Sequence, residues 1–84
     1  MHRDLQIAMN SPDDYVVVIE YLDDEMVLSR RFISPIRYIG EHKIEALCLA
    51  REAPRHFWLA RIQRHRLVPA HLVEMPAPIE EIAT

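Results

Sequence analysis

Glycine, cysteine and aromatic residues are all scarce in this sequence of 84 residues. Gly40 is the only glycine, which excludes a glycine-rich phosphate-binding loop. The only cysteine, Cys48, cannot form an internal disulfide, so the sequence does not fit the small secreted domains that disulfides hold together. No stretch approaches the ~20 apolar residues of a membrane span, and the N-terminus has no apolar signal core. We therefore expect a cytoplasmic protein that does not bind a membrane.

A chain this short forms one domain and buries only about 60% of the surface that its unfolded form exposes. Half of the residues are hydrophobic, but only two Phe, three Tyr and one Trp are among them. The core must therefore come mainly from Val, Ile, Leu and Met. Association with a second copy would be one way to bury more apolar surface.

The formal net charge of −3 conceals two oppositely charged parts. Residues 30–66 contain nine basic and three acidic side chains, which gives a net charge of +6. The rest of the chain contains one basic residue, Arg3, and ten acidic residues, which gives −9. Eight of the nine central basic residues are arginine, the side chain that binds phosphate or carboxylate with two parallel hydrogen bonds. They form either an anion-binding surface or a solvated surface whose charges cluster by chance.

The N-terminal segment has the spacing of a short helix. Over residues 4–9, Leu5, Ala8 and Met9 fall on one side of a helical turn. A cluster of turn-forming residues around Pro12 then breaks the helix. We expect this segment to be a helical turn followed by a linker.

The next part of the sequence predicts a β-hairpin. Residues 15–22 are mostly β-branched or aromatic, which is typical of a strand, and a polar turn leads to a second strand over residues 26–33. Pro35 interrupts the run that follows, and a central strand tolerates proline poorly. We therefore expect a bend, a bulge or a sheet edge at Pro35, before the turn that contains Gly40.

Residues 43–53 fit two kinds of secondary structure. One face of a strand would carry Ile44, Ala46, Cys48 and Ala50. One stripe of a helix would carry Ile44, Leu47, Cys48 and Arg51. The Ala, Leu and Glu content favours the helix. We nevertheless predict a strand, on the basis of the family resemblance given below.

The last third of the chain predicts more β-structure and then a tail. Residues 56–62 alternate in a way that fits a strand, and residues 63–68 continue as a further strand. The tail from Pro69 contains Pro76 and Pro78 and has Glu80-Glu81 near its end. We expect it to be poorly ordered past about Met75.

The order of short motifs along residues 15–68 is similar to that of WYL domains. The matching residues are, in order, Tyr21-Leu22, Arg31 with Pro35, Ala46 with Cys48, Arg51, Arg55 with Phe57, and Arg61-Ile62. The Trp-Tyr-Leu triplet that names the family falls on His42, Lys43 and Ile44, of which only the last is similar. Ala60 stands where an acidic residue often precedes the closing Arg-Ile pair.

The resemblance implies a mostly β fold, a small five-stranded Sm-like or SH3-type barrel over residues 15–68. A short N-terminal helix and linker would occupy residues 1–14, and a partly disordered, Pro-containing acidic tail residues 69–84. WYL domains are regarded as ligand sensors in bacterial transcription regulators and defence systems, with nucleotides or nucleic acid as suspected ligands. They usually follow a DNA-binding domain, for which residues 1–14 are too short, so we expect a stand-alone module.

The resemblance also names the candidate ligand-binding residues. These are Tyr21, Arg31, Arg51, Arg55 and Arg61, together with His42 and Lys43 of the altered triplet. The four arginines would form an anion cradle through charge-assisted bonds to phosphate oxygens. The alternative is that one or two of them, Arg61 first, pair with a core carboxylate and hold the fold together.

Aromatic residues are the candidates for stacking on nucleic-acid bases. Tyr21, Tyr38 and Trp58 are of the right type, although most aromatics in so small a domain belong to the core. Trp58 alternates away from Phe57 and has the better claim to the surface. Residues 61–66 are the densest basic segment and either track a phosphate backbone or form a solvated strand.

No constellation in the sequence supports catalysis, a metal or a cofactor. Cys48 and the five histidines fit no zinc motif, because no second cysteine lies close in sequence. A Cys-His nucleophile lacks any loop that would stabilise an oxyanion. We therefore expect a protein that is not an enzyme and in which Cys48 is a small buried side chain.

Two functional hypotheses remain. The first is a regulatory module that binds a nucleotide or a short single-stranded nucleic acid through an arginine-rich face. The second is a protein-interaction or self-association module without a nucleic-acid role, in which the acidic parts of the chain meet a basic partner or the arginines of a second copy.

Overall fold

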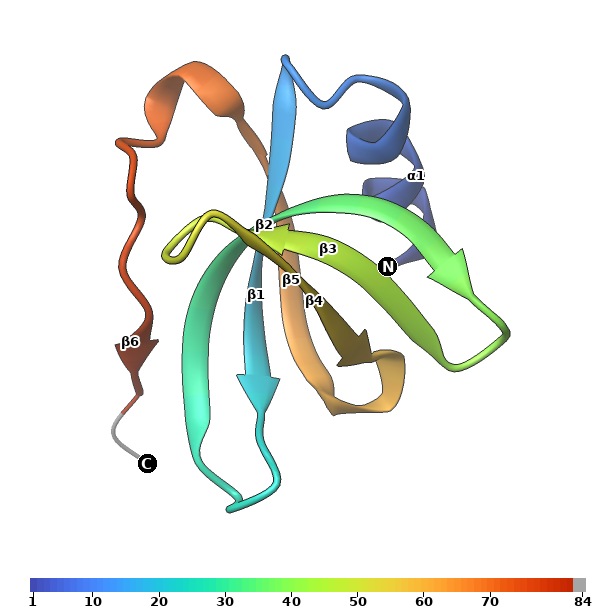
Figure 1. The fold of residues 1–84 in the computed structure, drawn as a ribbon, viewed down its shortest axis with the longest axis vertical. Coiled ribbons are helices and arrows are strands. Elements are labelled where there is room, and N and C mark those ends of the chain that lie inside the picture. The colour runs from blue at the N-terminus through green and yellow to red at the C-terminus, as the bar shows by residue number, and fades with distance from the viewer. Residues whose placement is uncertain (83–84) are drawn as a thin grey trace.

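The computed structural model describes residues 1–82 as one helix packed against a strongly bent antiparallel sheet (Figure 1). The elements in this range are α1 (His2–Asn10), β1 (Tyr15–Leu22), β2 (Leu28–Ile39), β3 (Lys43–Cys48), β4 (Ala53–Trp58), β5 (Ile62–Pro69) and β6 (Glu80–Glu81). Two single turns of 3-10 helix, η1 (Leu59–Arg61) and η2 (Ala70–Leu72), flank β5. The mostly β class with a short N-terminal helix is therefore as expected.

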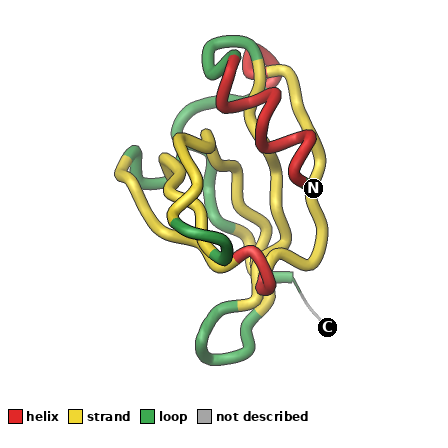
Figure 2. Tube along the Cα trace, turned by 90° about the vertical axis from the view of Figure 1, so that its right-hand side faces the viewer, coloured by secondary structure: helices red, strands yellow, loops and turns green. Residues whose placement is uncertain are grey.

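Helix α1 covers one side of the sheet, as Figure 2 shows from the side. Leu5 and Ala8 are fully buried, and Met9 packs partly against the same cluster, so the predicted apolar stripe is confirmed. The helix begins earlier than expected, at His2 instead of Asp4. No helix in residues 1–82 is long and apolar enough to cross a membrane.

Strand β2 connects the two halves of the sheet. The strand order is β4-β3-β2-β1-β5, and β2 pairs with β1 over residues 28–33 and with β3 over residues 33–39. The pairing register shifts between Pro35 and Arg37, which confirms the irregularity expected at the proline. The predicted end of the strand at residue 33 is wrong, since β2 continues to Ile39. The bulge accommodates Pro35 and lets β2 bend across the molecule (Figure 1).

The ambiguous segment is a strand, as predicted from the resemblance. In β3, Ile44, Ala46 and Cys48 are fully buried and alternate with partly exposed residues. The strand stops at Cys48, and the expected continuation to Ala53 is a turn in which Glu52 takes a positive φ of 52°. The pairing of β3 with both β2 and β4 thus outweighs the local helical propensity.

The prediction of one strand over residues 56–62 is wrong. β4 begins earlier, at Ala53, and ends at Trp58, where η1 turns the chain into β5. Alternation nevertheless holds within β4, because Phe57 is 1% exposed and Trp58 45%. The further strand expected over residues 63–68 is confirmed by β5.

Side-chain alternation gives the sheet two distinct faces. The face that we call the inner face carries Val17 and Ile19 of β1 and packs against α1 in the main core. The opposite or outer face carries Val18 and Glu20 of the same strand. A second, smaller buried cluster on the outer face includes Val16 and Ala77.

The tail returns to the sheet within the described residues. Ala77 is 3% exposed, and its backbone N–H donates to the carbonyl of Leu49 at 3.2 Å. Glu80 and Glu81 of β6 then pair with the first half of β2, so a short sixth strand joins the five that we expected. The tail expected past Met75 thus contains one short strand within residues 76–82, and residues 83–84 lie outside the described part.

Candidate functional site

Arg31 is the most deeply buried of the candidate site residues that carry a charge. It faces the inner side of β2 and is 8% exposed. Its Nε donates a hydrogen bond to the hydroxyl of Ser29 at 2.9 Å. The centre of the guanidinium lies 5.8 Å from the ring of Tyr21 and 5.9 Å from that of Phe57. The arginine is thus held against aromatic rings, which attract cations through their electron-rich faces.

The charge of Arg31 has no carboxylate partner within residues 1–82, since none lies within 4.0 Å. Burial lowers the pKa of this guanidinium, and the neighbouring Arg55 lowers it further. Cys48, Asp23 and Tyr21 act in the opposite direction. A second positive charge close to a poorly solvated one is unfavourable, and a bound anion would relieve both effects.

The Nη atoms of Arg31 have no hydrogen-bond partner among the described residues, although no side-chain nitrogen or oxygen in this range is both fully buried and without a partner. Among residues 1–82 these atoms are therefore not completely enclosed, even though the residue as a whole is only 8% exposed.

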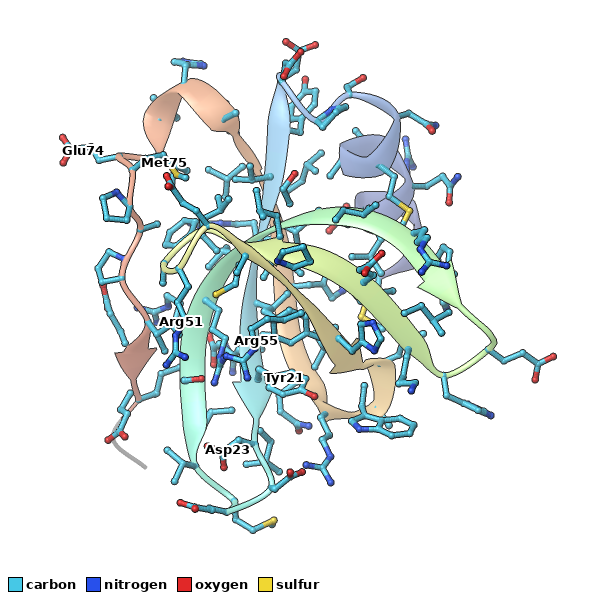
Figure 3. The ribbon with its side chains drawn as sticks, viewed as in Figure 1. Tyr21, Asp23, Arg51, Arg55, Glu74 and Met75 are labelled. Atoms are coloured by element: carbon cyan, nitrogen blue, oxygen red, sulfur yellow. The ribbon has the colours of Figure 1, made fainter. Side chains whose placement is uncertain are left out.

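Arg55 is the second arginine whose charge acts on Arg31, and Arg51 precedes it in the chain. Arg55 is in β4, two residues from Phe57 and therefore on the same face of that strand, and it is exposed. Arg51 is an exposed residue of the turn between β3 and β4. In Figure 3 both side chains extend toward the end of the sheet where Tyr21 and Asp23 lie. Neither has a carboxylate partner within residues 1–82.

Asp23 is the carboxylate whose charge raises the pKa of Arg31. It is already engaged in a turn. Its Oδ1 accepts hydrogen bonds from the backbone N–H groups of Glu25 and Val27, each at 2.9 Å. These bonds shape the turn between β1 and β2. Arg55 acts on the charge of Arg31, and Arg51 belongs to the turn that precedes β4; we call these three residues the inner arginine cluster.

Arg61 differs from the other predicted arginines because it has an acidic partner. Its Nη1 forms a salt bridge with Asp24 in the turn between β1 and β2. The Asp24 side chain is 88% exposed, so the partner is a surface carboxylate and not the core carboxylate of our alternative. An ion pair this exposed contributes little to stability, and Arg61 stays accessible to a competing anion.

Tyr21 has a structural role within the core. Its hydroxyl accepts a hydrogen bond from the backbone N–H of Trp58 at 3.0 Å. Its ring meets that of Phe57 edge to face, with centroids 5.0 Å apart. With an exposure of 8% it forms the floor under Arg31 and has no ring face free for stacking on a base.

A second group of candidate residues lies where β3 begins and β4 ends; it consists of His42, Lys43 and Trp58. Lys43 Nζ is 5.0 Å from the ring centroid of Trp58, with which it pairs across the strands. The His42 carbonyl accepts the N–H of Leu59 at 2.8 Å, and its side chain is exposed. Trp58 is the predicted stacking residue that keeps an exposed ring, and Lys43 partly covers it.

Tyr38, the other predicted stacking residue, is occupied by α1. Its hydroxyl is 2.8 Å from Nδ1 of His2, and the two rings are 5.6 Å apart. Removal from water raises the pKa of the phenol. Tyr38 therefore helps to hold the helix on the sheet.

Two hollows within residues 1–82 lie on the outer face of the sheet. One has a volume of about 510 Å³ and is bordered by Arg30, Arg64 and Arg66. A second, of about 400 Å³, adjoins it through Phe32 and Arg66. Sequence reasoning noted the basic run over residues 61–66 but could not place it beside Arg30.

Cys48 is fully buried, as expected. Among residues 1–82, no group of three or more His, Cys, Asp or Glu side chains is placed to hold a metal ion.

Comparison with models of known protein families gave no match, and searches of curated proteins and of solved structures gave none either. The description of the site therefore rests on the chain itself.

Proposed function

We propose that this protein is a ligand-binding regulatory module of the WYL type, and that it binds a nucleotide or a short single-stranded nucleic acid through the inner arginine cluster. The observation that carries the proposal is Arg31, a largely buried guanidinium without a carboxylate partner in residues 1–82 and with a second arginine beside it. A phosphate group would supply the missing negative charge and accept bonds from both side chains.

The proposed barrel is consistent with this function. The strand order β4-β3-β2-β1-β5 and the bend of β2 are compatible with a barrel in which residues from β2, β4 and the β3–β4 turn would meet at one end. In an Sm-like or SH3-type barrel, β4 and β5 would close around the inner face. Arg31 would then sit at the mouth of the barrel, with Arg51 and Arg55 at its rim.

The test is binding of a fluorescent oligothymidine, measured by anisotropy at several salt concentrations. If three arginines each neutralise one phosphate, log K should fall with log salt with a slope of about −2. Arg55→Ala and Arg51→Ala should each weaken binding and reduce the slope by about 0.7. Arg37→Ala is the control, because Arg37 is exposed and paired with Glu45 at 2.9 Å, far along β2.

Absence of binding at low salt, or equal binding by the Arg51, Arg55 and Arg37 variants, would contradict the proposal. Size-exclusion chromatography at low and high salt would then examine the second function. A dimer that dissociates as salt rises would favour self-association by complementary charge.

A further inference from the structure

The outer face of the sheet carries a groove that the proposed function does not use. It lies over β1, β2 and β5, where Val18 and Glu20 point away from the main core. Glu20 pairs with Arg30 on one side and with Arg64 on the other, and Val18 pairs with Phe32 and Arg66. The groove is therefore basic at its edges and apolar along part of its floor.

One end of the groove carries two arginines that form no ion pair within residues 1–82. Arg64 and Arg66 are exposed, and within the described residues neither has a carboxylate within 4.0 Å. Because they are two residues apart on one strand, their backbone positions are separated by about 6.6 Å along β5. Arg30 is already paired with Glu80 at 3.6 Å.

The charges around this end leave room for one anionic group. The three arginines face two carboxylates, Glu20 and Glu80, so the border carries a net charge of +1. A carboxylate or phosphate placed between Arg64 and Arg66 would accept charge-assisted hydrogen bonds from both. A polyanion would instead be repelled by the two acids.

The other end of the groove is apolar and open. The hollow of about 400 Å³ is bordered mainly by the apolar residues Phe32, Val68, Leu72, Val73, Ala77 and Pro78, and Arg66 and Glu74 are its two charged residues. Leu72 is 66% exposed, so part of this apolar surface is in contact with water. Phe32 and Arg66 border both hollows, which makes the basic end and the apolar end continuous.

We propose that the outer groove binds a small amphiphile, with a single carboxylate or phosphate head group at Arg64 and Arg66 and its apolar chain over Phe32 and Leu72. The volumes of both hollows fall within the range of small-molecule sites. Each methylene that the apolar end removes from water strengthens binding by about fourfold. This site is separate from the inner arginine cluster and does not depend on the proposed nucleic-acid function.

The test is titration of the full chain with decanoate and with decyl phosphate, both kept below the concentration at which they form micelles. Binding is measured by calorimetry and located by the backbone NMR shifts of β5 and of Val73. Decanol is the uncharged control ligand. We expect saturable binding of both anions, and the combined change Arg64→Ala and Arg66→Ala should weaken it about tenfold without altering decanol binding.

Two further variants separate the parts of the proposal. Leu72→Ser should weaken the binding of both anions and of decanol alike, because it removes apolar contact. Arg55→Ala should leave the binding of all three ligands unchanged, whereas it should weaken the binding of oligothymidine if the proposed function holds. Circular dichroism of each variant shows that the fold is retained.

The proposal is overturned if neither anion binds saturably, or if binding depends on Arg55 and not on Arg64 and Arg66. It is also overturned if only vesicles of anionic phospholipid bind, while the monomeric amphiphiles do not. That last result would indicate a membrane surface as the partner of the arginines.

Discussion

Arg30 and Arg31 are neighbours in sequence, but they lie in opposite environments. The side chain of Arg30 is on the outer face, 44% exposed, and is paired with Glu80. Arg31 is on the inner face, 8% exposed as a residue, and has no acidic partner within residues 1–82. The charge of Arg30 is neutralised by Glu80, whereas the charge of Arg31 is destabilised by burial and by Arg55.

The comparison shows that the face of the strand on which an arginine lies determines which interactions would favour the binding of an anion. On the inner face, an anion relieves desolvation and the repulsion between Arg31 and Arg55. On the outer face, an anion competes with water for Arg64 and Arg66, so an apolar contact must supply much of the affinity. The two faces therefore favour different ligands despite the same residue type.

The largest expected difference between the faces concerns packing. Ile19 is fully buried on the inner face, and Ile19→Ala should lower the free energy of unfolding by about 2–5 kcal/mol. Val18 is the adjacent residue on the outer face, and Val18→Ala should cost only about 1 kcal/mol. Urea denaturation of the two variants measures both values, and equal losses would contradict the assignment of faces.

The next effect concerns the buried charge. Replacing Arg31 with Met keeps an apolar side chain against Tyr21 and Phe57 and removes the charge, so it should stabilise the protein by about 1 kcal/mol. Arg30→Met should change stability by no more than about 0.5 kcal/mol. Thermal unfolding in a buffer free of phosphate makes the comparison. A strong destabilisation by Arg31→Met would mean that the arginine is a structural support and not an anion site.

A smaller effect is expected from the exposed pair of Arg61 and Asp24. Asp24→Asn should change the free energy of unfolding by less than about 1 kcal/mol, and salt should abolish the difference. The same change should strengthen oligothymidine binding slightly, because it frees Arg61 for a phosphate. Anisotropy at low salt measures this; weaker binding would show that Asp24 positions Arg61 for the ligand.

The smallest effect is a dependence on high pH at the junction between α1 and the sheet. Burial raises the pKa of Tyr38 above its ordinary value of 10.0, so the folded state favours the neutral phenol. Its contribution to stability is complete below pH 10 and is lost as the pH rises through the raised pKa. Above pH 10 the wild type should therefore lose stability relative to Tyr38→Phe in urea titrations. Parallel curves would contradict this.

Much of the fold was predictable because it follows from local patterns. Six of the eight residues of β1 are β-branched or aromatic, and the predicted limits of the strand match the structure. The limits of β4 were not predictable, because Leu59 and Ala60 continue the alternation in sequence while the chain turns through η1. Residues 43–53 had local propensity for a helix, and only pairing with two neighbouring strands makes β3 extended.

The candidate site was predictable in composition more than in arrangement. The sequence pointed to Arg31, Arg51 and Arg55, but not to the burial of Arg31 or to its contact with Ser29. Tyr38 was one candidate for stacking, with a core role as the alternative, and its partner is His2, 36 residues away in sequence. The groove beside Arg64 and Arg66 depends on strand register, which a single sequence does not reveal.

The continuous backbone of β2 gives the two faces a mechanical connection. Because Arg30 and Arg31 share a peptide bond, a ligand that shifts this stretch of strand from one side also moves the side chain on the other. Any such effect must be reciprocal, since binding free energies are linked: whatever factor an amphiphile imposes on nucleic-acid affinity, the nucleic acid imposes on the amphiphile. The twelve-residue strand β2 would then couple the binding of a ligand on one face of the sheet to the binding of a ligand on the other.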